Sequence, residues 1–164
     1  MVKYKNFKSS EPYEITFHPY YLKQFNSRWF AFGLNEDNKA PRWNLALDRI
    51  ESFYETNLKL KPSETDWEEY FYDLVGVTRP ENTSIQEIIL KFSPDVAPYI
   101  LTKPLHPSQK HTKDPTGLEV RIQVIPNFEL EKLVLSFGEQ VKVISPLEFK
   151  DRISQRLRSA NSQY

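Results

Sequence analysis

A two-residue alternation of apolar and polar side chains constrains the first third of this 164-residue chain to β-structure. Tyr13, Ile15 and Phe17 alternate with polar side chains, as they do in a strand that buries one face. Asn26 and Ser27 then predict a tight turn, because Asn tolerates the left-handed backbone conformation. Short antiparallel strands joined by such turns favour a small barrel or sandwich.

The following residues extend this β-pattern to about residue 54. Aromatic side chains are frequent over 28–34, and Gly33 predicts a bulge or a close approach of two backbones. A polar turn is expected over 35–41, and one or two further strands over 43–54.

Residues 58–83 are predicted to connect this β-segment to a second part of the chain. Thr65 and Asp66 predict the start of a helix, and Gly76 predicts its end. The apolar residues of this helix share one face: Trp67, Tyr70, Phe71 and Leu74.

The second half predicts alternating strands and helices. Asn127 is expected to cap a helix that Gly138 stops, and the last helix is expected to turn Phe149, Ile153 and Leu157 inward. The full order is a strand over 84–92, a helix over 93–101, a polar strand over 105–112, a strand over 118–125, a helix over 127–137, a strand over 141–144 and a helix opened by Ser145-Pro146. This βαββαβ order plus one helix is ferredoxin-like.

Composition excludes several kinds of chemistry. The 22 basic and 22 acidic residues cancel, so no overall field drives binding to nucleic acid. Cysteine is absent, which excludes disulfides, thiol catalysis and thiolate metal sites and fits a reducing cytosol. No apolar run is long enough to cross a bilayer, so we expect a cytoplasmic protein without a membrane partner.

Charge is distributed unevenly along the chain. Basic residues exceed acidic ones over 1–34, acidic residues dominate 51–75, and the tail from Val141 is basic again. This distribution indicates either a local face for an anionic ligand or a solvated mixed surface.

Enzyme motifs are missing from the sequence. It has no G-x-S-x-G, no H-E-x-x-H and, with four glycines, no glycine-rich phosphate loop. His106 and His111 are five residues apart without a third ligand, so no metal site is expected. We therefore predict a protein that is not an enzyme and that uses no cofactor.

Two neighbouring strands supply candidates for ligand binding. On a regular strand His18 and Tyr20 share one face and Lys23 lies on the other, while Arg28 and Phe30 share a face of the next strand. Guanidinium groups bind oxyanions and aromatic rings stack on bases, which suits a phosphate with an attached base. We expect an anionic, base-containing ligand at six residues: His18, Tyr20, Lys23, Arg28, Phe30 and Arg49.

Structural roles are the alternative for these and neighbouring side chains. His18 could serve as a structural hydrogen-bonding group, Lys23 as a solvated cation, and Arg49 as a partner of Asp48 or Glu51. Trp29, Tyr21 and Phe32 are candidates for the barrel core. In the second half, three residues of the predicted polar strand could either pair a sheet edge or contact a ligand: His106, Gln109 and Lys110.

Three segments occur in order within residues 2–55: His18-Pro19-Tyr20-Tyr21-Leu22, Arg28-Trp29-Phe30-Ala31-Phe32-Gly33 and Leu47-Asp48-Arg49-Ile50. Together they resemble the core of the WYL domain, a small barrel of bacterial transcription regulators named after a Trp-Tyr-Leu triplet. The triplet reads Trp29-Phe30-Ala31 here, and Ala46 stands where the family often has Arg.

The second half resembles the C-terminal extension that often follows a WYL domain. The resemblance is carried by Leu105-His106-Pro107-Ser108-Gln109-Lys110, by residues 127–138 and by Val141-Lys142-Val143-Ile144-Ser145-Pro146. The two resemblances imply an α+β protein with an SH3/Sm-like β-barrel over 1–57, a connector over 58–83 and a ferredoxin-like extension over 84–164.

The resemblance also implies a function. The expected role is a ligand-sensing domain that binds a nucleotide or a short single-stranded nucleic acid and signals to a separate DNA-binding domain. Such regulators usually begin with a winged helix-turn-helix and none precedes Tyr4, so we expect a chain cut from a longer, homodimeric regulator that binds promoter DNA through that domain. The alternatives are an oligomerisation module without a ligand and a stand-alone accessory nucleic-acid-binding protein.

Overall fold

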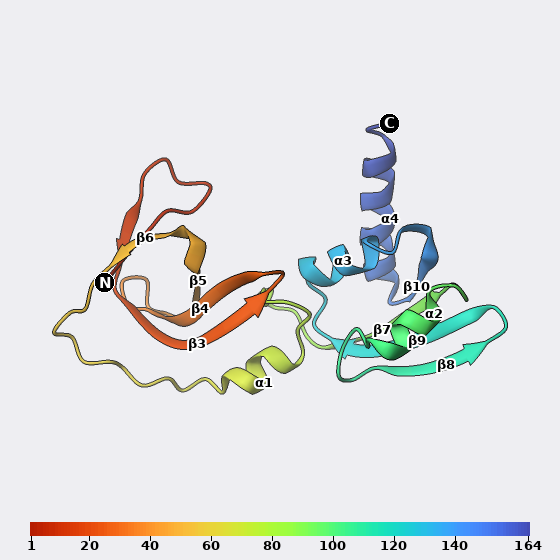
Figure 1. Ribbon diagram of the computed structural model, residues 1–164, viewed down its shortest axis with the longest axis horizontal. Helices are drawn as coiled ribbons and strands as arrows, with labels where there is room; N and C mark the ends of the chain where they lie inside the picture. The colour runs from red at the N-terminus through yellow and green to blue at the C-terminus, as the bar shows by residue number, and fades with distance from the viewer. The chain divides into compact units, whose positions relative to one another are not determined.

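Two units, residues 1–68 and 69–164, make up the computed structural model, which describes all 164 residues of the chain (Figure 1). The regular elements of the first unit are β-strands, apart from a short 3-10 helix and the first residues of a helix at its end, and the second unit combines a sheet with helices. The predicted fold class, an N-terminal β-domain followed by an α+β unit, is therefore confirmed. The finer division into 1–57, 58–83 and 84–164 stays a prediction.

The first unit is built from two three-stranded antiparallel sheets that share a core. Tyr4, Ile15 and Leu45 are buried between the sheets, because the period-2 alternation turns one face of each strand inward. One sheet has the order β2-β1-β6 and the other the order β3-β4-β5. The strands are β1 (Val2–Tyr4), β2 (Tyr13–Ile15), β3 (Phe17–Phe25), β4 (Arg28–Asn35), β5 (Ala40–Ala46) and β6 (Ile50–Phe53), with a short 3-10 helix, η1 (Leu47–Arg49), before β6.

The β3–β4 hairpin has the tight turn that its sequence predicts. Asn26 and Ser27 both take positive φ angles, 47° and 61°, the backbone that a two-residue hairpin requires. Gly33 lies close to the backbone of β3, since a Cβ atom added there would be 2.1 Å from the carbonyl oxygen of His18. The predicted close approach at Gly33 is therefore confirmed.

The connector helix is shorter than expected. Residues 54–66 have no regular structure, and α1 spans Trp67–Tyr72 instead of reaching Gly76. Leu74 and Val75 are nevertheless buried, and Gly76 takes a φ of +95°. The apolar periodicity therefore marks buried residues correctly but not the length of the helix.

The second unit has the predicted ferredoxin-like topology. Its four strands form an antiparallel sheet in the order β10-β7-β9-β8, which is the strand order of a βαββαβ fold. The elements are β7 (Gln86–Phe92), α2 (Ala97–Thr102), β8 (Lys110–Asp114), β9 (Gly117–Val124), α3 (Phe128–Leu135), η2 (Gly138–Gln140), β10 (Val141–Ser145) and α4 (Leu147–Asn161).

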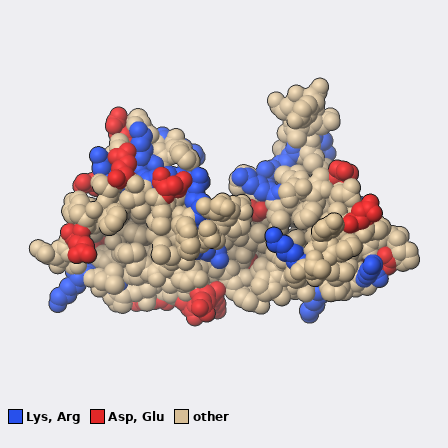
Figure 2. Space-filling view, in the orientation of Figure 1, with Lys and Arg blue, Asp and Glu red and all other residues tan.

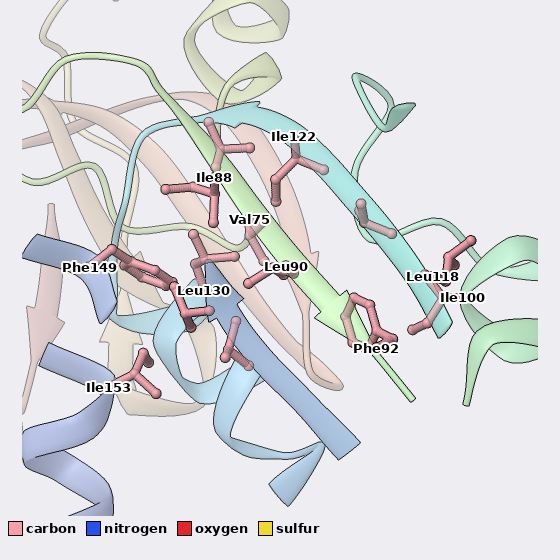
Figure 3. Close-up of a cluster of buried hydrophobic side chains, with 14 of the residues drawn as sticks. Val75, Ile88, Leu90, Phe92, Ile100, Leu118, Ile122, Leu130, Phe149 and Ile153 are labelled. Carbon is pink, nitrogen blue, oxygen red and sulfur yellow. The ribbon is translucent and has the colours of Figure 1, made fainter. Parts of the chain in front are cut away.

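The core of this unit lies between one face of the sheet and the helices (Figure 3). Ile88 and Leu90 from β7 and Ile122 from β9 are fully buried there, as alternation predicts. Asn127 caps α3 as predicted, because its Oδ1 accepts a hydrogen bond from the backbone N–H of Leu130 at 2.8 Å. The capped helix in turn supplies Leu130 to the core.

Two expectations about this unit were wrong. The polar strand begins at Lys110 and not at Leu105, because residues 103–109 form turns. On α4, Phe149 and Ile153 are buried, but Leu157 is 47% exposed, since the C-terminal half of the helix projects beyond the sheet of its unit (Figure 1). None of the helices is long and apolar enough to span a bilayer.

Candidate ligand-binding site

A β-bulge at Tyr20 changes which side chains share a face of the β3–β4 hairpin. The register shifts between Pro19 and Tyr21, so Lys23 lies directly opposite Phe30. Residues directly opposite in an antiparallel pair point to the same side, and Arg28, two residues from Phe30, points there too. The expectation that Lys23 lies on the other side was wrong, because a bulge inserts one residue and reverses the alternation beyond it.

The hairpin face defined by Lys23, Arg28 and Phe30 joins two cations to an aromatic ring. Burial lowers the pKa of the Lys23 ammonium, and the Nε of Arg28 lies 3.0 Å from Oδ2 of Asp48 in η1. The ring of Phe30 packs 6.5 Å, centroid to centroid, from that of Phe32. Lys and Arg side chains lie among Asp and Glu over the first unit (Figure 2), and the guanidinium of this face is itself paired with a carboxylate.

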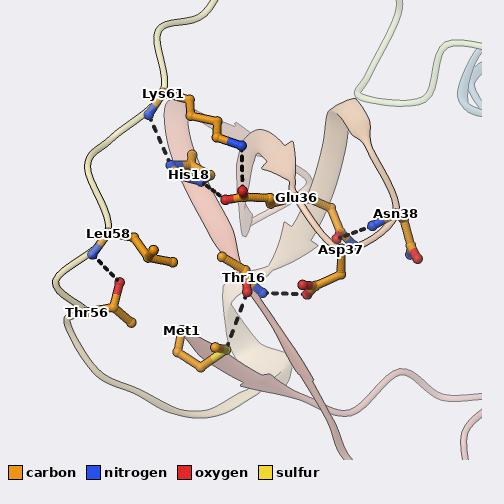
Figure 4. Close-up of polar contacts among 10 residues, drawn as sticks. Met1, Thr16, His18, Glu36, Asp37, Asn38, Thr56, Leu58 and Lys61 are labelled. Carbon is orange, nitrogen blue, oxygen red and sulfur yellow. Dashed lines mark hydrogen bonds and ion pairs between the residues drawn. The ribbon is translucent and has the colours of Figure 1, made fainter.

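His18 is placed in a polar cluster with Glu36 and Lys61 (Figure 4). The imidazole is buried, and its Nδ1 accepts a hydrogen bond of 3.2 Å from the backbone N–H of Lys61. Its Nε2 therefore carries the proton and donates to Oε2 of Glu36 at 2.7 Å. The Lys61 ammonium also binds this carboxylate, and hydrogen bonds from Lys61 and His18 together lower the pKa of Glu36.

Tyr20 is covered by an aromatic cluster around Trp67. The indole of Trp67 lies 6.4 Å from the ring of Tyr20 and stacks on Tyr21 with centroids 6.1 Å apart and 16° between the planes. It also lies 5.9 Å from the ring of Phe32. The hydroxyl of Tyr20 is buried without a hydrogen-bond partner, and burial raises its pKa.

Residues 61–67, which we call the strap, thus lie across the His18 and Tyr20 side chains. The candidates differ in their contacts: His18 and Tyr20 contact the strap, and Lys23 and Arg28 lie beside Phe30 on the hairpin face. Sequence reasoning missed Glu36 and Trp67. Contacts from Lys61 to His18 span 43 residues, and no local pattern in the sequence reports a pairing at that distance.

Arg49 packs against the ring of Phe7, in the loop between β1 and β2. Its guanidinium carbon lies 3.9 Å from the centroid of the Phe7 ring, and its Nε is buried without a partner. Asp48 and Glu51, the carboxylates considered as ion-pair partners of Arg49, pair with other cations. Asp48 pairs with Arg28 at 3.0 Å and Glu51 with Lys3 at 3.5 Å.

The remaining candidates also receive definite positions. Trp29, a candidate for the barrel core, is 47% exposed near the tip of the hairpin, whereas Phe32 is buried. In the second unit His106 is buried, with Nε2 bound to the carbonyl of Tyr72 at 2.6 Å. Gln109 bonds the backbone of Ile100 and Leu105, and Lys110 is exposed on β8. His106 and Gln109 therefore lie in a loop before β8 and join it to the backbone of Tyr72 and Ile100.

Comparison with known proteins places this pair of units in a family. Residues 1–54 match the model of the WYL domain, and residues 84–160 match that of the WCX domain. The chain is therefore a WYL-domain protein in which a WCX domain follows the WYL domain, and the resemblance seen in its sequence is confirmed.

Two solved structures are similar to 99% of the chain. Proteasome accessory factor B/C (PafBC) of Arthrobacter aurescens is 19% identical with a TM-score of 0.42, and a CRISPR Cas-related protein is 12% identical with a TM-score of 0.56. The second similarity is one of fold. The chain spans 24% of the first structure and 46% of the second. No curated protein matches the sequence.

Proposed function

We propose that this chain is the effector-sensing part of a bacterial transcription regulator and that its ligand is a nucleotide or a short single-stranded nucleic acid. In this proposal the ligand binds the hairpin face, and its binding is signalled to a separate DNA-binding domain. The WYL and WCX matches support this class of protein, because WYL domains occur in such regulators.

The pairing of Lys23 with Phe30 across the β3–β4 ladder carries the proposal. A nucleotide presents a flat base and an anionic phosphate, which require a ring to stack on and a cation to pair with. Phe30 supplies the ring, Lys23 lies beside it, and Arg28 adds a guanidinium two residues along the same strand. Binding of a phosphate by these two local cations does not require a net positive charge on the whole protein.

The strap gives the hairpin face a physical connection to the rest of the chain. Phe30 packs on Phe32, and Phe32 packs on Trp67, the first residue of α1. A ligand stacked on Phe30 is therefore two ring contacts from Trp67, the residue at which α1 begins. In this proposal His18 and Tyr20 hold the strap and do not contact the ligand.

Titration of labelled ligands tests the proposal. A fluorescent oligothymidylate of about ten nucleotides and AMP are titrated with the wild-type chain at low and high salt. Loss of a charged hydrogen bond costs roughly 1.5–3 kcal/mol, so Arg28→Ala and Lys23→Ala should each weaken binding about ten- to a hundredfold. Lys113→Ala, which removes the same charge from exposed β8, should bind like the wild type. Equal affinities for all four proteins would contradict the proposal.

One observation favours the alternative of an oligomerisation module. Strand β8 forms an edge of the second sheet, and all five of its residues are exposed. An open strand edge can pair with a second copy of the chain. Sedimentation equilibrium that shows a dimer, together with no binding in the titration, would favour this function over ligand sensing.

A further inference from the structure

We infer that the strap, residues 61–67, is a pH-sensitive device that opens at its Lys61 end when the His18 imidazole takes up a proton. The strap is held to the first unit at both ends. At one end the backbone N–H of Lys61 donates to Nδ1 of His18 at 3.2 Å (Figure 4). At the other end the indole of Trp67 stacks on the ring of Tyr21. The inference concerns the first contact and does not depend on the proposed function.

The chain around Lys61 has little else to hold it against the strands. Residues 56–64 are all exposed, and the other backbone hydrogen bonds of 56–65 are made to side chains within the segment itself. The backbone N–H of Lys61 therefore supplies the hydrogen bond that joins this segment to β3. Once that bond breaks, the segment can leave the surface as far as Trp67.

The hydrogen bond from Lys61 requires a neutral imidazole. Nε2 of His18 carries a proton, since it donates to Oε2 of Glu36 at 2.7 Å, and Nδ1 accepts through its lone pair. A second proton on Nδ1 would point at the N–H of Lys61, so that two donors would face each other. Because only 5% of His18 is exposed, solvent does not stabilise a charged ring while the strap is closed.

Glu36 favours the open strap once the imidazole is charged. With the strap closed, the Lys61 ammonium binds Oε1 of Glu36 and a neutral imidazole donates to Oε2. An imidazolium at Oε2 would supply a positive charge of its own, so the carboxylate keeps a counter-charge when the ammonium leaves. The proton on His18 thus takes the place of the Lys61 ammonium.

The other ionisable groups beside the ring keep their charge over the range in which histidine titrates. The phenol of Tyr20 stays protonated, because burial raises its pKa. Glu36 stays ionised, because hydrogen bonds from Lys61 and His18 lower its pKa. Asp37 accepts a hydrogen bond from the backbone N–H of Thr16 at 2.7 Å and does not bind the imidazole.

Proton linkage then sets the direction of the effect. The closed strap binds one proton fewer than the open strap, so the closed form is favoured at high pH. As pH falls through the range of an accessible histidine, the open form gains population. Acidification therefore uncovers His18 and Tyr20.

The experiment measures exchange of the Lys61 amide hydrogen with solvent by NMR of the whole ¹⁵N-labelled chain. Each rate is corrected for the pH dependence of exchange in an unprotected amide. An accessible histidine titrates near pH 6.5, so the opening equilibrium should rise about tenfold between about pH 7.5 and 5.5. The corrected exchange of the buried residues Ala31 and Leu45 should stay constant, which separates opening of the strap from unfolding of the unit.

Three variants test the origin of this pH dependence. His18→Asn retains an acceptor for the N–H of Lys61 but cannot take up a proton, so its corrected exchange should not vary with pH. His111→Asn removes a histidine from exposed β8 and should match the wild type. Glu36→Gln removes the carboxylate that supports the imidazolium, so the rise should occur at lower pH.

Corrected exchange of Lys61 that is independent of pH in the wild type would overturn the inference, as would an equal rise in His18→Asn. The ¹⁵N shifts of the His18 ring give a second measurement. They should report the Nε2–H form at about pH 7.5, and a proton on Nδ1 there would contradict the closed geometry. If His18→Asn does not give a folded amide spectrum, Glu36→Gln decides, and a rise at the same pH as in the wild type would overturn the inference.

Discussion

The indole of Trp67 stacks almost parallel on the phenol ring of Tyr21, with 16° between the planes. This contact joins the first residue of α1 to β3 and is extended by the contact of Trp67 with Phe32 on β4. Since Trp67 is buried, Trp67→Ala should destabilise the first unit by about 3–5 kcal/mol. The measurement is the free energy of opening of the β4 amides by hydrogen exchange.

Trp29→Ala is the matched control for this prediction. It removes the same side chain from a position that is 47% exposed, so the loss should be about 1 kcal/mol. Equal losses from both substitutions would show that the strap does not stabilise the hairpin.

Glu36 should make the stability of the first unit depend on pH. Hydrogen bonds from Lys61 and His18 hold the pKa of Glu36 below its ordinary value of 4.5. A carboxylate with a lowered folded-state pKa stabilises the protein fully above its unfolded pKa, and this stabilisation is lost as pH falls through the folded value. Glu36→Gln should therefore lower the urea midpoint at pH 7, and its difference from the wild type should close below pH 4.5.

Glu64→Gln controls for the general effect of losing a carboxylate. Glu64 is exposed in the strap, so its replacement should leave the urea midpoint unchanged across the same pH range. A Glu36→Gln deficit that persists unchanged at the lowest pH would show that packing, and not charge, is the origin of the effect.

Much of the fold could be predicted from local sequence signals. The Asn26-Ser27 turn and the Asn127 cap each depend on the conformational preference of one or two residues, and both occur where expected. The ferredoxin-like order follows from alternation within 84–145. Leu157 was misplaced because helical periodicity shows which residues share a face but not where the neighbouring sheet ends.

The site was less predictable, for two physical reasons. A bulge such as that at Tyr20 adds one residue without any change in composition, yet it moves Lys23 to the face of Phe30. The partners of His18 come from positions 36 and 61, and such long-range pairing is set by the folded structure. The sequence therefore indicated which kinds of side chain to consider for a ligand site. It did not indicate which of them lie together in the fold.

Gly33 should be intolerant of any side chain. A Cβ atom there would lie 2.1 Å from the carbonyl oxygen of His18 and 2.8 Å from Cζ of Phe17. The first atom belongs to the backbone and cannot rotate away, so Gly33→Ala should cost about 3 kcal/mol, the upper end for overpacking. Hydrogen exchange in β3 and β4 should report the loss.

Gly138→Ala provides the comparison. Its Cβ would meet nothing within 4 Å, but the φ of +55° is left-handed, so a cost of about 1–2 kcal/mol is expected from backbone strain alone. The loss should be confined to the second unit. Unchanged exchange of β3 and β4 in Gly33→Ala would contradict the close approach.

Asp48 should restrain ligand binding at the hairpin face. Its carboxylate lies 3.0 Å from the Nε of Arg28 and competes with a ligand phosphate for that guanidinium. Partly exposed ion pairs contribute about 0.2–1 kcal/mol, so Asp48→Asn should tighten oligonucleotide binding up to about fivefold. Glu55→Gln, which removes the same charge from an exposed position in the same unit, should have no comparable effect.

A double-mutant cycle shows whether this gain acts through Arg28. If the two side chains compete as the geometry indicates, Asp48→Asn should have little effect once Arg28 is replaced by alanine, because the cycle isolates the pairwise interaction. The affinities are measured by the anisotropy of a labelled oligothymidylate at one fixed salt concentration, since phosphate contacts depend on salt. An Asp48→Asn gain of the same size in both backgrounds would show that the added affinity does not act through Arg28.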